Sequence, residues 1–384
     1  MRIDFLFGPV STGDRPLEFQ RMDDSPRGQT GTDNSFCGYA RAMAERGHEV
    51  IIYADKVAAQ VWDTGKAQIR VLPYSDRLGG FYLEVDAAIA WNDIGGLVDM
   101  PRGILRVLNM QVNDWHFVRS KAEFDGVDLL IAPSRALIDH LFGLYRPPGW
   151  GAEVVPNGCD PTAYRVGTRV PGRCVYASSP DRGLHVVLQK WTKIRAAVPG
   201  ATLRIFYHAL PAWVARCDFL LERGHGSDRE QGRRGKIIRD ALPRLASQGV
   251  EYVGGVSRVE LARELCDADV MAYPCDTVRT FKDGWGSEGF GVAVLEGCAA
   301  GAVPVITDCD AFGEVYGGVC PMVRQGEGWT DRWADELIAV LRDRTVREER
   351  RRAGHAFALK HAWPVLAERL ETVLREAKGK KAAA

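Results

Sequence analysis

The chain of 384 residues lacks several features that would place it in a specialised class of protein. It has no excess charge, because 50 basic side chains balance 50 acidic ones, and this excludes a protein that binds nucleic acid through bulk positive charge. No window holds the roughly 18 apolar residues of a membrane span. There is no fixed-period repeat and no low-complexity tract. What is left is a globular protein, 46% apolar, with either two ordinary domains or one large unit.

The cysteines and the N-terminus lack the marks of export. The nine cysteines are scattered and none forms a C-x-x-C pair, so the sequence indicates neither a zinc site nor a disulfide framework. The chain begins directly with an apolar segment, without the basic region and cleavage site of a signal peptide. These features predict a reducing, cytoplasmic compartment. A C-terminal run of Gly, Lys and Ala predicts a disordered tail.

The balanced total hides an uneven distribution of charge. Residues 1–160 carry 16 Lys/Arg against 22 Asp/Glu, whereas residues 161–384 carry 34 against 28. An acidic half joined to a basic half indicates two domains with different ligands. The basic half is the better host for a phosphate-bearing ligand.

Short apolar runs alternate with longer amphipathic segments, which is typical of a parallel α/β sheet with crossover helices. The pattern occurs twice, and turn-forming residues at 155–161 separate the two series, so we place the hinge there. The strands are expected at 2–7, 49–53, 68–72, 86–91, 104–108 and 127–132, and then at 173–178, 202–207, 250–253, 269–273 and 303–306. Polar stretches at 11–33, 224–236 and 275–287 are predicted as loops or insertions.

The stretch from Gly286 to Gly297 holds the most informative constellation. Glu288 precedes a predicted helix that starts near Gly291, and Glu296 lies about a turn and a half inside it. Glycines let a ligand approach the backbone, and a helix N-terminus favours a diphosphate. Two carboxylates beside such a cradle fit a ligand that has a sugar at each end of a diphosphate. The same spacing also fits a glycine-rich loop with solvated glutamates, so spacing alone leaves both interpretations open.

Glu288 and Glu296 also match the E-x7-E motif of the GT4 family of retaining glycosyltransferases. The surrounding sequence, EGFGVAVLEGCAAGAVPVIT, resembles that family's signature. Segments that resemble its other motifs follow in the family's order, at 46–50, 132–134, 155–158, 181–184, 266–274 and 361–363. The likeness spans nearly the whole chain and is most specific over 152–320.

The resemblance implies the GT-B architecture, in which two Rossmann-like domains face a cleft and the C-terminal helix crosses back to the first. The acceptor domain would cover 1–157, joined by a C-terminal helix at 362–378, and the donor domain would cover 158–361. The implied activity is transfer of a sugar, with retention, from a nucleotide diphosphate sugar to an acceptor hydroxyl.

The resemblance also implies roles for residues of the donor site. Glu296 would bind the donor ribose, and Glu288 would contact hydroxyls of the donor sugar. Arg182 would take the place of a phosphate-binding lysine, with a fork of donors instead of a point charge. Backbone N–H groups would contact the sugar and diphosphate from Gly289, Phe290 and Gly291.

The chain departs from the family pattern at Ala177, where a second basic residue is usual. The charge of the phosphates must then be offset in another way. Candidates are two serines and two cations of the 275–287 stretch: Ser178, Ser179, Arg279 and Lys282.

The first domain should supply contacts to the acceptor. Gly31 and Thr32 take the place of the family's N-terminal Gly-Gly loop. Polar residues that follow expected strands are further candidates for acceptor contacts: Asn92, Asp93, Asn113, Asp114 and His116. Asp114 and His116 could transfer protons, and loop capping is the competing interpretation for each of them. Four tryptophans are candidates for stacking on a sugar: Trp115, Trp150, Trp213 and Trp285.

No metal or other cofactor is expected. The resemblance also implies that no protein nucleophile is needed and that electrostatic preorganisation around the leaving phosphate carries the catalysis. Asp308 and Asp310 could hold magnesium, but they fall where the family has a polar turn.

The acidic first half favours a glycan, a small molecule or a protein as the acceptor over an anionic membrane or a nucleic acid backbone. A modified nucleic acid base and a lipid-linked acceptor stay open, and no stable membrane insertion is expected. Two alternatives to a transferase also stay open: a non-catalytic nucleotide-sugar binder, and a GT-B epimerase or phosphorylase.

Overall fold

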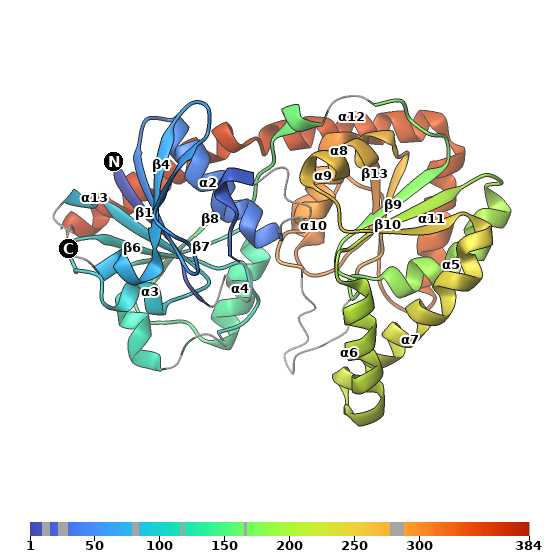
Figure 1. Cartoon of the computed structure of the whole chain (residues 1–384), viewed down its shortest axis with the longest axis horizontal. Coiled ribbons are helices and arrows are strands. Elements are labelled where there is room, and N and C mark those ends of the chain that lie inside the picture. Colours follow the sequence, from blue (N-terminus) through green and yellow to red (C-terminus); the bar gives the residue numbers. More distant parts are fainter. Residues whose placement is uncertain are drawn as a thin grey trace. The chain divides into compact units, whose positions relative to one another are not determined.

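The computed structural model describes residues 1–9, 16–21, 30–78, 84–115, 118, 120–164, 167–276 and 288–383. These residues form two compact units (Figure 1). The first holds the described residues of Met1–Met22, Gln29–Gly158 and His361–Ala384, and the second holds those of Cys159–Lys360. Among the described residues, no helix is both long and apolar enough to cross a membrane.

An eight-stranded sheet forms the centre of the first unit, in the order β3-β4-β2-β1-β5-β6-β7-β8. Its strands are β1 Arg2–Phe7, β2 Glu49–Ala54, β3 Gln60–Asp63, β4 Gln68–Pro73, β5 Ala87–Trp91, β6 Leu105–Asn109, β7 Leu129–Ala132 and β8 Gly151–Val154. Every pair is parallel except β3 with β4. The six strands expected in this half are therefore present. The two edge strands β3 and β8 were not expected.

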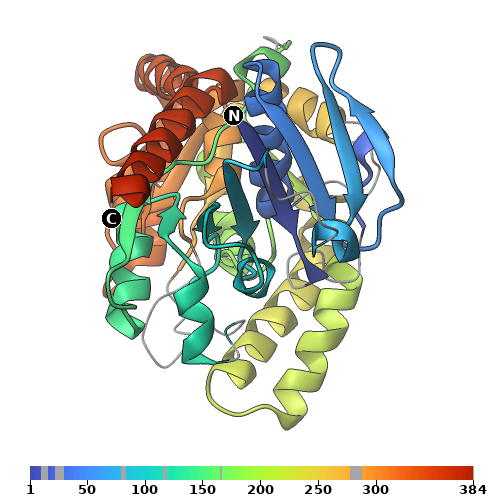
Figure 2. The ribbon, with the colours of Figure 1, turned by 90° about the vertical axis from the view of Figure 1, so that its left-hand side faces the viewer.

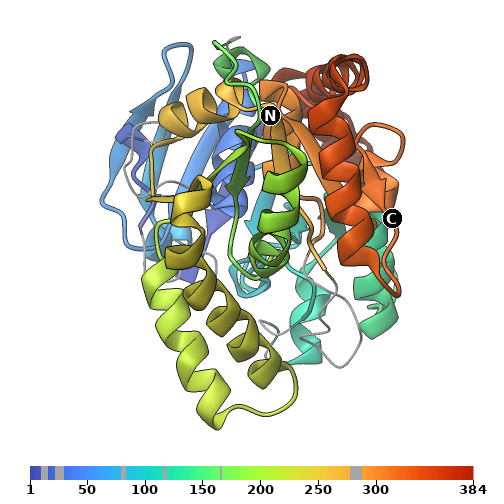
Figure 3. The ribbon, with the colours of Figure 1, turned by 90° about the vertical axis from the view of Figure 1, so that its right-hand side faces the viewer.

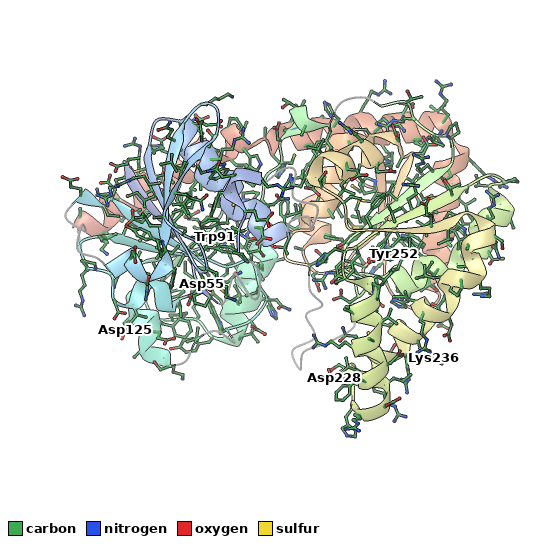
Figure 4. The ribbon with its side chains drawn as sticks, viewed as in Figure 1. Asp55, Trp91, Asp125, Asp228, Lys236 and Tyr252 are labelled. Atoms are coloured by element: carbon green, nitrogen blue, oxygen red, sulfur yellow. The ribbon has the colours of Figure 1, made fainter. Side chains whose placement is uncertain are left out.

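Helices pack against this sheet, which faces the viewer in Figure 2. They are α2 Gly31–Glu45, α3 Gly95–Val98, α4 Arg135–Leu144 and α13 Trp363–Ala383, with short 3-10 helices η1 Phe19–Arg21, η2 Tyr74–Leu78 and η4 Lys121–Gly126. The core centres on aromatic contacts. Phe36 of α2 meets Trp91 of β5 at 5.1 Å and Phe7 of β1 at 4.5 Å between ring centroids. Figure 4 labels Trp91 in this core.

The C-terminal helix α13 is part of the first unit. Leu366, Leu370 and Leu374 are buried in its core, and each contributes about 1.5–3 kcal/mol by burial. At the start of the helix, the ring of Trp363 fills space that two glycines leave open. A Cβ would lie 2.2 Å from that ring at Gly38 and 2.6 Å from it at Gly158.

The prediction of a disordered C-terminal tail is wrong. Helix α13 continues to Ala383. Its lysines pair with carboxylates of the acidic first unit, Lys378 with Asp86 and Lys381 with Asp128 at 2.6 Å. These ion pairs depend on the tertiary structure, which composition does not reveal.

The second unit has a six-stranded parallel sheet in the order β11-β10-β9-β12-β13-β14. Its strands are β9 Arg173–Ala177, β10 Thr202–Phe206, β11 Val250–Gly254, β12 Val270–Tyr273, β13 Val303–Thr307 and β14 Met322–Val323. All five strands expected here are present, and only the two-residue β14 was missed.

Helices cover both faces of this sheet (Figure 3). They are α5 Leu184–Ala197, α6 Leu210–Arg223, α7 Ser227–Leu245, α8 Arg258–Asp267, α9 Val292–Ala300, α10 Phe312–Tyr316, α11 Trp329–Arg342 and α12 Arg344–Lys360, with η5 Pro161–Ala163 and η6 Ala246–Gln248. One core lies under α5, α7 and α11, and the other lies under α8, α9, α10 and α12.

The predicted loop at 224–236 is mostly helix, so that prediction is wrong. Helix α6 ends at Arg223 and α7 begins at Ser227, and the two form a hairpin on which Figure 4 labels Asp228 and Lys236. Two of the glycines that indicated a loop, Gly232 and Gly235, lie where the two helices touch. A Cβ on Gly235 would lie 2.1 Å from the Cβ of Cys217. Close helix packing, not flexibility, accounts for this glycine.

Candidate functional site

The turn between β9 and α5 places Arg182 at the carboxyl edge of the second sheet. Ligands of open α/β sheets bind at this edge. Gly183 follows Arg182 with φ of +96°, and a Cβ there would lie 2.0 Å from the carbonyl oxygen of Pro274. Only glycine allows the turn to approach the end of β12 so closely.

A hydrogen-bonded cluster joins the two neighbouring strands β9 and β12. Arg182 Nε lies 2.7 Å from Glu288 Oε1, and Arg182 Nη1 lies 3.1 Å from Asp181 Oδ2. The Tyr273 hydroxyl donates to Glu288 Oε1 at 2.7 Å. Ser178 Oγ lies 3.1 Å from that hydroxyl. The structure thus brings together three predicted residues, Ser178, Arg182 and Glu288.

Burial controls the electrostatics of the cluster. The Glu288 residue is only 6% exposed. Burial raises the pKa of its carboxyl above the ordinary value, against the attraction of Arg182. Burial also disfavours the charged Arg182, but the carboxylates of Glu288 and Asp181 outweigh it and raise the pKa of Arg182. Each member of the pair therefore depends on the other to carry charge.

The N-terminus of α9 lies directly after Glu288. Gly291 is the N-cap residue of the helix, with φ of +80°, and as a glycine it offers no capping side chain. The first N–H groups of a helix lack partners within it and attract anions. Two hydrogen bonds fix the loop before the helix. Tyr316 donates to the carbonyl of Gly291 at 2.9 Å, and Asp310 accepts from the backbone N–H of Glu288 at 3.0 Å. Phe290 is buried at 3% exposure, so its side chain serves the core.

Glu296 lies on α9 and has partners of its own. Its Oε1 is 3.4 Å from Arg258 Nη2. The hydroxyl of partly buried Tyr164 also bonds to it, and burial and the carboxylate together raise the pKa of Tyr164. The carboxylate is therefore oriented by a cation and a hydroxyl.

The positions of the other predicted site residues of this unit are as follows. Ser179 contributes its carbonyl, which accepts from the Tyr176 hydroxyl at 2.6 Å. Gly289 lies in the bend between Glu288 and α9. Arg279, Lys282 and Trp285 lie outside the described residues. Trp213 is half-buried against the core.

The two aspartates considered as magnesium ligands accept hydrogen bonds from backbone N–H groups. Asp308 accepts from the N–H of Gln325 at 2.7 Å, and Asp310 accepts from that of Glu288. In the described part of the chain, no group of three or more His, Cys, Asp or Glu could hold a metal ion.

In the first unit, polar residues gather at the carboxyl ends of β5 and β6. Asn92 has φ of +57°, a conformation that asparagine tolerates better than most residues. Its Oδ1 accepts from the backbone N–H of Gln111 at 2.7 Å. The Gln111 side chain donates to Asn109 Oδ1 at 2.7 Å and accepts from Asn157 at 2.8 Å. This amide network joins both strand ends to the chain segment that leaves the unit.

Asp93 is held beside the network. Its two carboxylate oxygens accept from the Tyr74 hydroxyl and the Gly95 N–H, both at 3.1 Å. Burial, followed by the negative charge of Asp93, raises the pKa of Tyr74. Tyr74 is therefore a hydrogen-bond donor at any physiological pH.

Gly31 and Thr32 open α2, as expected for the N-terminal loop. Thr30 and Asp33 form a capping box there, in which each side chain bonds to the other residue's backbone N–H. Because this box adds a carboxylate and occupies an N–H group, it weakens the attraction of this helix start for an anion.

The remaining candidates of the first unit differ in their surroundings. Asp114 is half-buried, and His116 lies outside the described residues. Trp115 and Trp150 pack with Phe124 at ring distances of 5.2 and 5.4 Å. Their indoles donate to the backbone carbonyls of Leu141 and Phe124, which are structural contacts.

Several residues of these clusters were missed from the sequence: Asp181, Tyr273, Arg258, Asn109 and Gln111. Tyr273 stood inside a recognised strand motif and was taken only as strand. Its hydroxyl meets Ser178, which follows β9, because β9 and β12 are neighbours in the sheet, and no local pattern reveals that neighbourhood.

Comparison with solved structures identifies the architecture. AviGT4, a glycosyltransferase involved in avilamycin A biosynthesis, superposes with a TM-score of 0.67 at 18% identity, over 99% of this chain and 98% of that one. Sucrose-phosphate synthase from Thermosynechococcus elongatus gives a TM-score of 0.67 at 11% identity, over 100% of both chains. The protein has the GT-B fold, which confirms the expected fold class.

Sequence comparison then identifies the kind of domain that the second unit carries. The family model described as Glycosyl transferases group 1 matches residues 172–343, so the second unit carries a domain of this group and the GT4 resemblance is confirmed. A phosphatidyl-myo-inositol mannosyltransferase of Mycobacterium tuberculosis is 30% identical over 239 residues, which cover 60% of this chain and 56% of that protein. The chain thus spans little more than half the length of the curated relatives it matches.

Proposed function

We propose that the protein is a retaining glycosyltransferase that moves a sugar from a nucleotide diphosphate sugar to an acceptor hydroxyl. One observation carries the proposal. The cluster of Ser178, Arg182, Tyr273 and Glu288 adjoins the start of α9, whose N-cap residue is Gly291, within the group 1 domain. A cation and an N-terminal dipole beside one another suit a diphosphate.

In this proposal, Arg182 and the start of α9 stabilise the charge that develops on the leaving phosphate. Such preorganised groups supply much of an enzyme's rate enhancement. Glu288 would bind hydroxyls of the donor sugar and Glu296 the ribose, each oriented by the partners described above. The mechanism assigns no step to a metal ion.

The first unit would bind the acceptor, through Asn92, Asp93 and the amide network, with Asp114 and His116 as candidates for proton transfer. The names of two curated relatives describe acceptors that bear inositol, phosphatidyl-myo-inositol in one and D-inositol 3-phosphate in the other. A small-molecule and a lipid-linked acceptor are therefore both proposed for testing. None of the nine cysteines is in a disulfide bond and all are buried, which supports a reducing compartment such as the cytoplasm.

Donor binding tests the proposal directly. Thermal shift is measured with a panel of nucleoside diphosphates and their sugars, since a bound donor raises Tm according to RT ln(1 + [L]/Kd). The Glu296→Ala variant should bind the best donor at least about tenfold more weakly, because a charged hydrogen bond contributes about 1.5–3 kcal/mol. Glu349→Ala is the matched control, since Glu349 is exposed on α12 of the same unit. Unchanged donor binding by the Glu296 variant would contradict the proposed donor site.

The charge of the site favours one alternative, a non-catalytic nucleotide-sugar binder. Arg182 is paired with two carboxylates, and Ala177 supplies no second cation. A diphosphate must therefore compete with Glu288 and Asp181 for Arg182. Saturable binding of a nucleoside diphosphate sugar, without release of nucleotide in the presence of any offered acceptor, would favour this alternative. Dependence of turnover on inorganic phosphate would instead indicate a phosphorylase.

A further inference from the structure

The first unit contains a cavity at the amino edge of its sheet. It has a volume of about 780 Å³ and opens where the starts of β6, β7 and β8 meet the last turns of α13. Small-molecule sites have volumes of roughly 300–1,000 Å³. The proposed acceptor residues lie at the other edge, since β6 runs from Leu105 to Asn109 and spans roughly 13 Å. The cavity is therefore separate from the site described above.

One side of the cavity is apolar and rigid. Phe124 packs against Tyr145 at 5.0 Å and against Trp150 at 5.4 Å between ring centroids. The indole of Trp150 donates to the carbonyl of Phe124 at 3.2 Å, which fixes its orientation. Aliphatic and proline residues complete this wall: Leu105, Val127, Leu129, Pro147, Pro148, Val373 and Ala377. Such a wall accommodates a flat or extended apolar body.

An ion-paired cluster with surplus positive charge also lines the cavity. The Asp128 carboxylate accepts from Arg106 at 3.1 Å and from Lys381 at 2.6 Å. Hydrogen bonds from both cations lower the pKa of Asp128, although burial opposes them. The single negative charge of Asp128 is thus shared by two cations. One of them, Arg106, is only 8% exposed. The net positive charge of this cluster attracts an anionic partner.

Three more cations line the cavity from separate elements. The side chains of Arg102 and Lys380 make no hydrogen bond or ion pair with any residue that the structure describes, and Lys121 lies 5.0 Å above the Tyr145 ring. The acidic residues of the lining are Asp125, which Figure 4 labels, Asp128, Glu153 and Glu376. Five cations thus face four carboxylates, although residues 1–160 as a whole are acidic.

We propose that this cavity binds an amphiphilic organic anion. The apolar body would lie against Phe124, Tyr145 and Trp150. Its single phosphate, sulfate or carboxylate group would pair with Arg102 and Lys380 beside the cluster around Asp128. Arginine binds such groups through two parallel hydrogen bonds. The site is a second ligand site of the chain, and it does not rest on the proposed transfer reaction.

Binding of decyl phosphate below its micelle concentration tests this proposal by isothermal titration calorimetry. Decanol supplies the apolar body alone, and inorganic phosphate supplies the anion alone. Saturable binding of one decyl phosphate, at least about tenfold tighter than either part, is the expected result. Binding of decanol as tight as that of decyl phosphate would overturn the proposal, and so would the absence of saturable binding.

Two variants locate the binding. Arg102→Ala/Lys380→Ala should weaken decyl phosphate at least about tenfold, whereas the matched pair Lys66→Ala/Arg70→Ala, on exposed cations of the same unit, should not. Gly151→Leu should fill the cavity and weaken decyl phosphate and decanol alike. A Cβ at Gly151 would meet Leu129 at an ordinary 3.6 Å, so this variant should fold. Equal loss in both double variants would refute the site.

Cosedimentation with vesicles decides whether the anion is a lipid headgroup or a free molecule. Cosedimentation of the wild type with phosphatidylglycerol-containing vesicles, lost in Arg102→Ala/Lys380→Ala, would assign the site to a lipid headgroup. Binding of decyl phosphate without cosedimentation would assign it to a free molecule. Either result supports a site for an amphiphilic anion.

Discussion

Removal of the positive charge at Arg182 should destabilise the second unit in a pH-dependent way. The perturbation is Arg182→Met, which keeps the apolar stem and removes the guanidinium. Its partner Glu288 is 6% exposed and lies 2.7 Å from Arg182 Nε. Loss of one partner from a buried pair costs about 3–5 kcal/mol. For a unit of this size, that loss corresponds to a decrease in Tm of about 6–20 °C.

The sign of the pH dependence follows from the pKa of Glu288. Burial already raises this pKa, and Arg182 is the main force that lowers it. Without Arg182 the pKa rises further, so the folded state keeps a proton that the unfolded state releases. The penalty should therefore be small near pH 5 and grow as the pH rises toward 8.

Thermal unfolding followed by tryptophan fluorescence and circular dichroism at several pH values measures the effect. Arg352→Met is the matched control, because Arg352 is exposed on α12 and makes no ion pair with any residue in the described part. In Arg182→Met/Glu288→Gln the penalty should be less than the sum of the single effects. A penalty below about 1 kcal/mol at pH 8, or one that does not change with pH, would refute the reasoning, since both follow from the buried pair.

Two further predictions concern burial and packing. Burial lowers the pKa of His185 to about 3. The free energy of unfolding should therefore fall as the pH drops from 6.5 toward that value, by about 2 kcal/mol between pH 7 and 5. Denaturant unfolding should show this loss in the wild type and not in His185→Leu. Gly38→Ala should cost about 1–3 kcal/mol, because its Cβ would lie 2.2 Å from the Trp363 ring. Gly143→Ala, in a helix with open space, should instead gain about 0.5–1 kcal/mol; a gain at both glycines would contradict the tight packing of Trp363.

Much of the secondary structure could be predicted because its causes are local. The segment 2–7 coincides with β1, since a parallel strand buried on both faces is mostly apolar, and here only Arg2 and Asp4 interrupt the run. The N-cap of α4 is also a local feature, since the side chain of Ser134 accepts from the N–H of Leu137. Strands β3 and β8 were missed because edge strands are short and only partly buried.

The glycines of 224–236 show where local reasoning fails. The local sequence around Gly232 and Gly235 fits a loop and a helix contact equally well. What distinguishes the two cases is α6, which packs against them and leaves no room for a Cβ. The lysines of the C-terminal tail are a similar case, because Lys381 is ordered by Asp128, more than two hundred residues earlier in the chain.

The sequence by itself determined the succession of strands and helices, the two-part charge distribution and the motif that contains Glu288 and Glu296. These follow from residue order, periodicity and resemblance. Only the tertiary structure decided that Arg182, Tyr273 and Glu288 form one cluster. The reason is physical: hydrogen bonds and buried ion pairs act over about 3 Å, and which side chains come that close depends on the order of strands in the sheet. The same holds for the cavity beside α13, whose cations meet only after the last helix returns to the first unit.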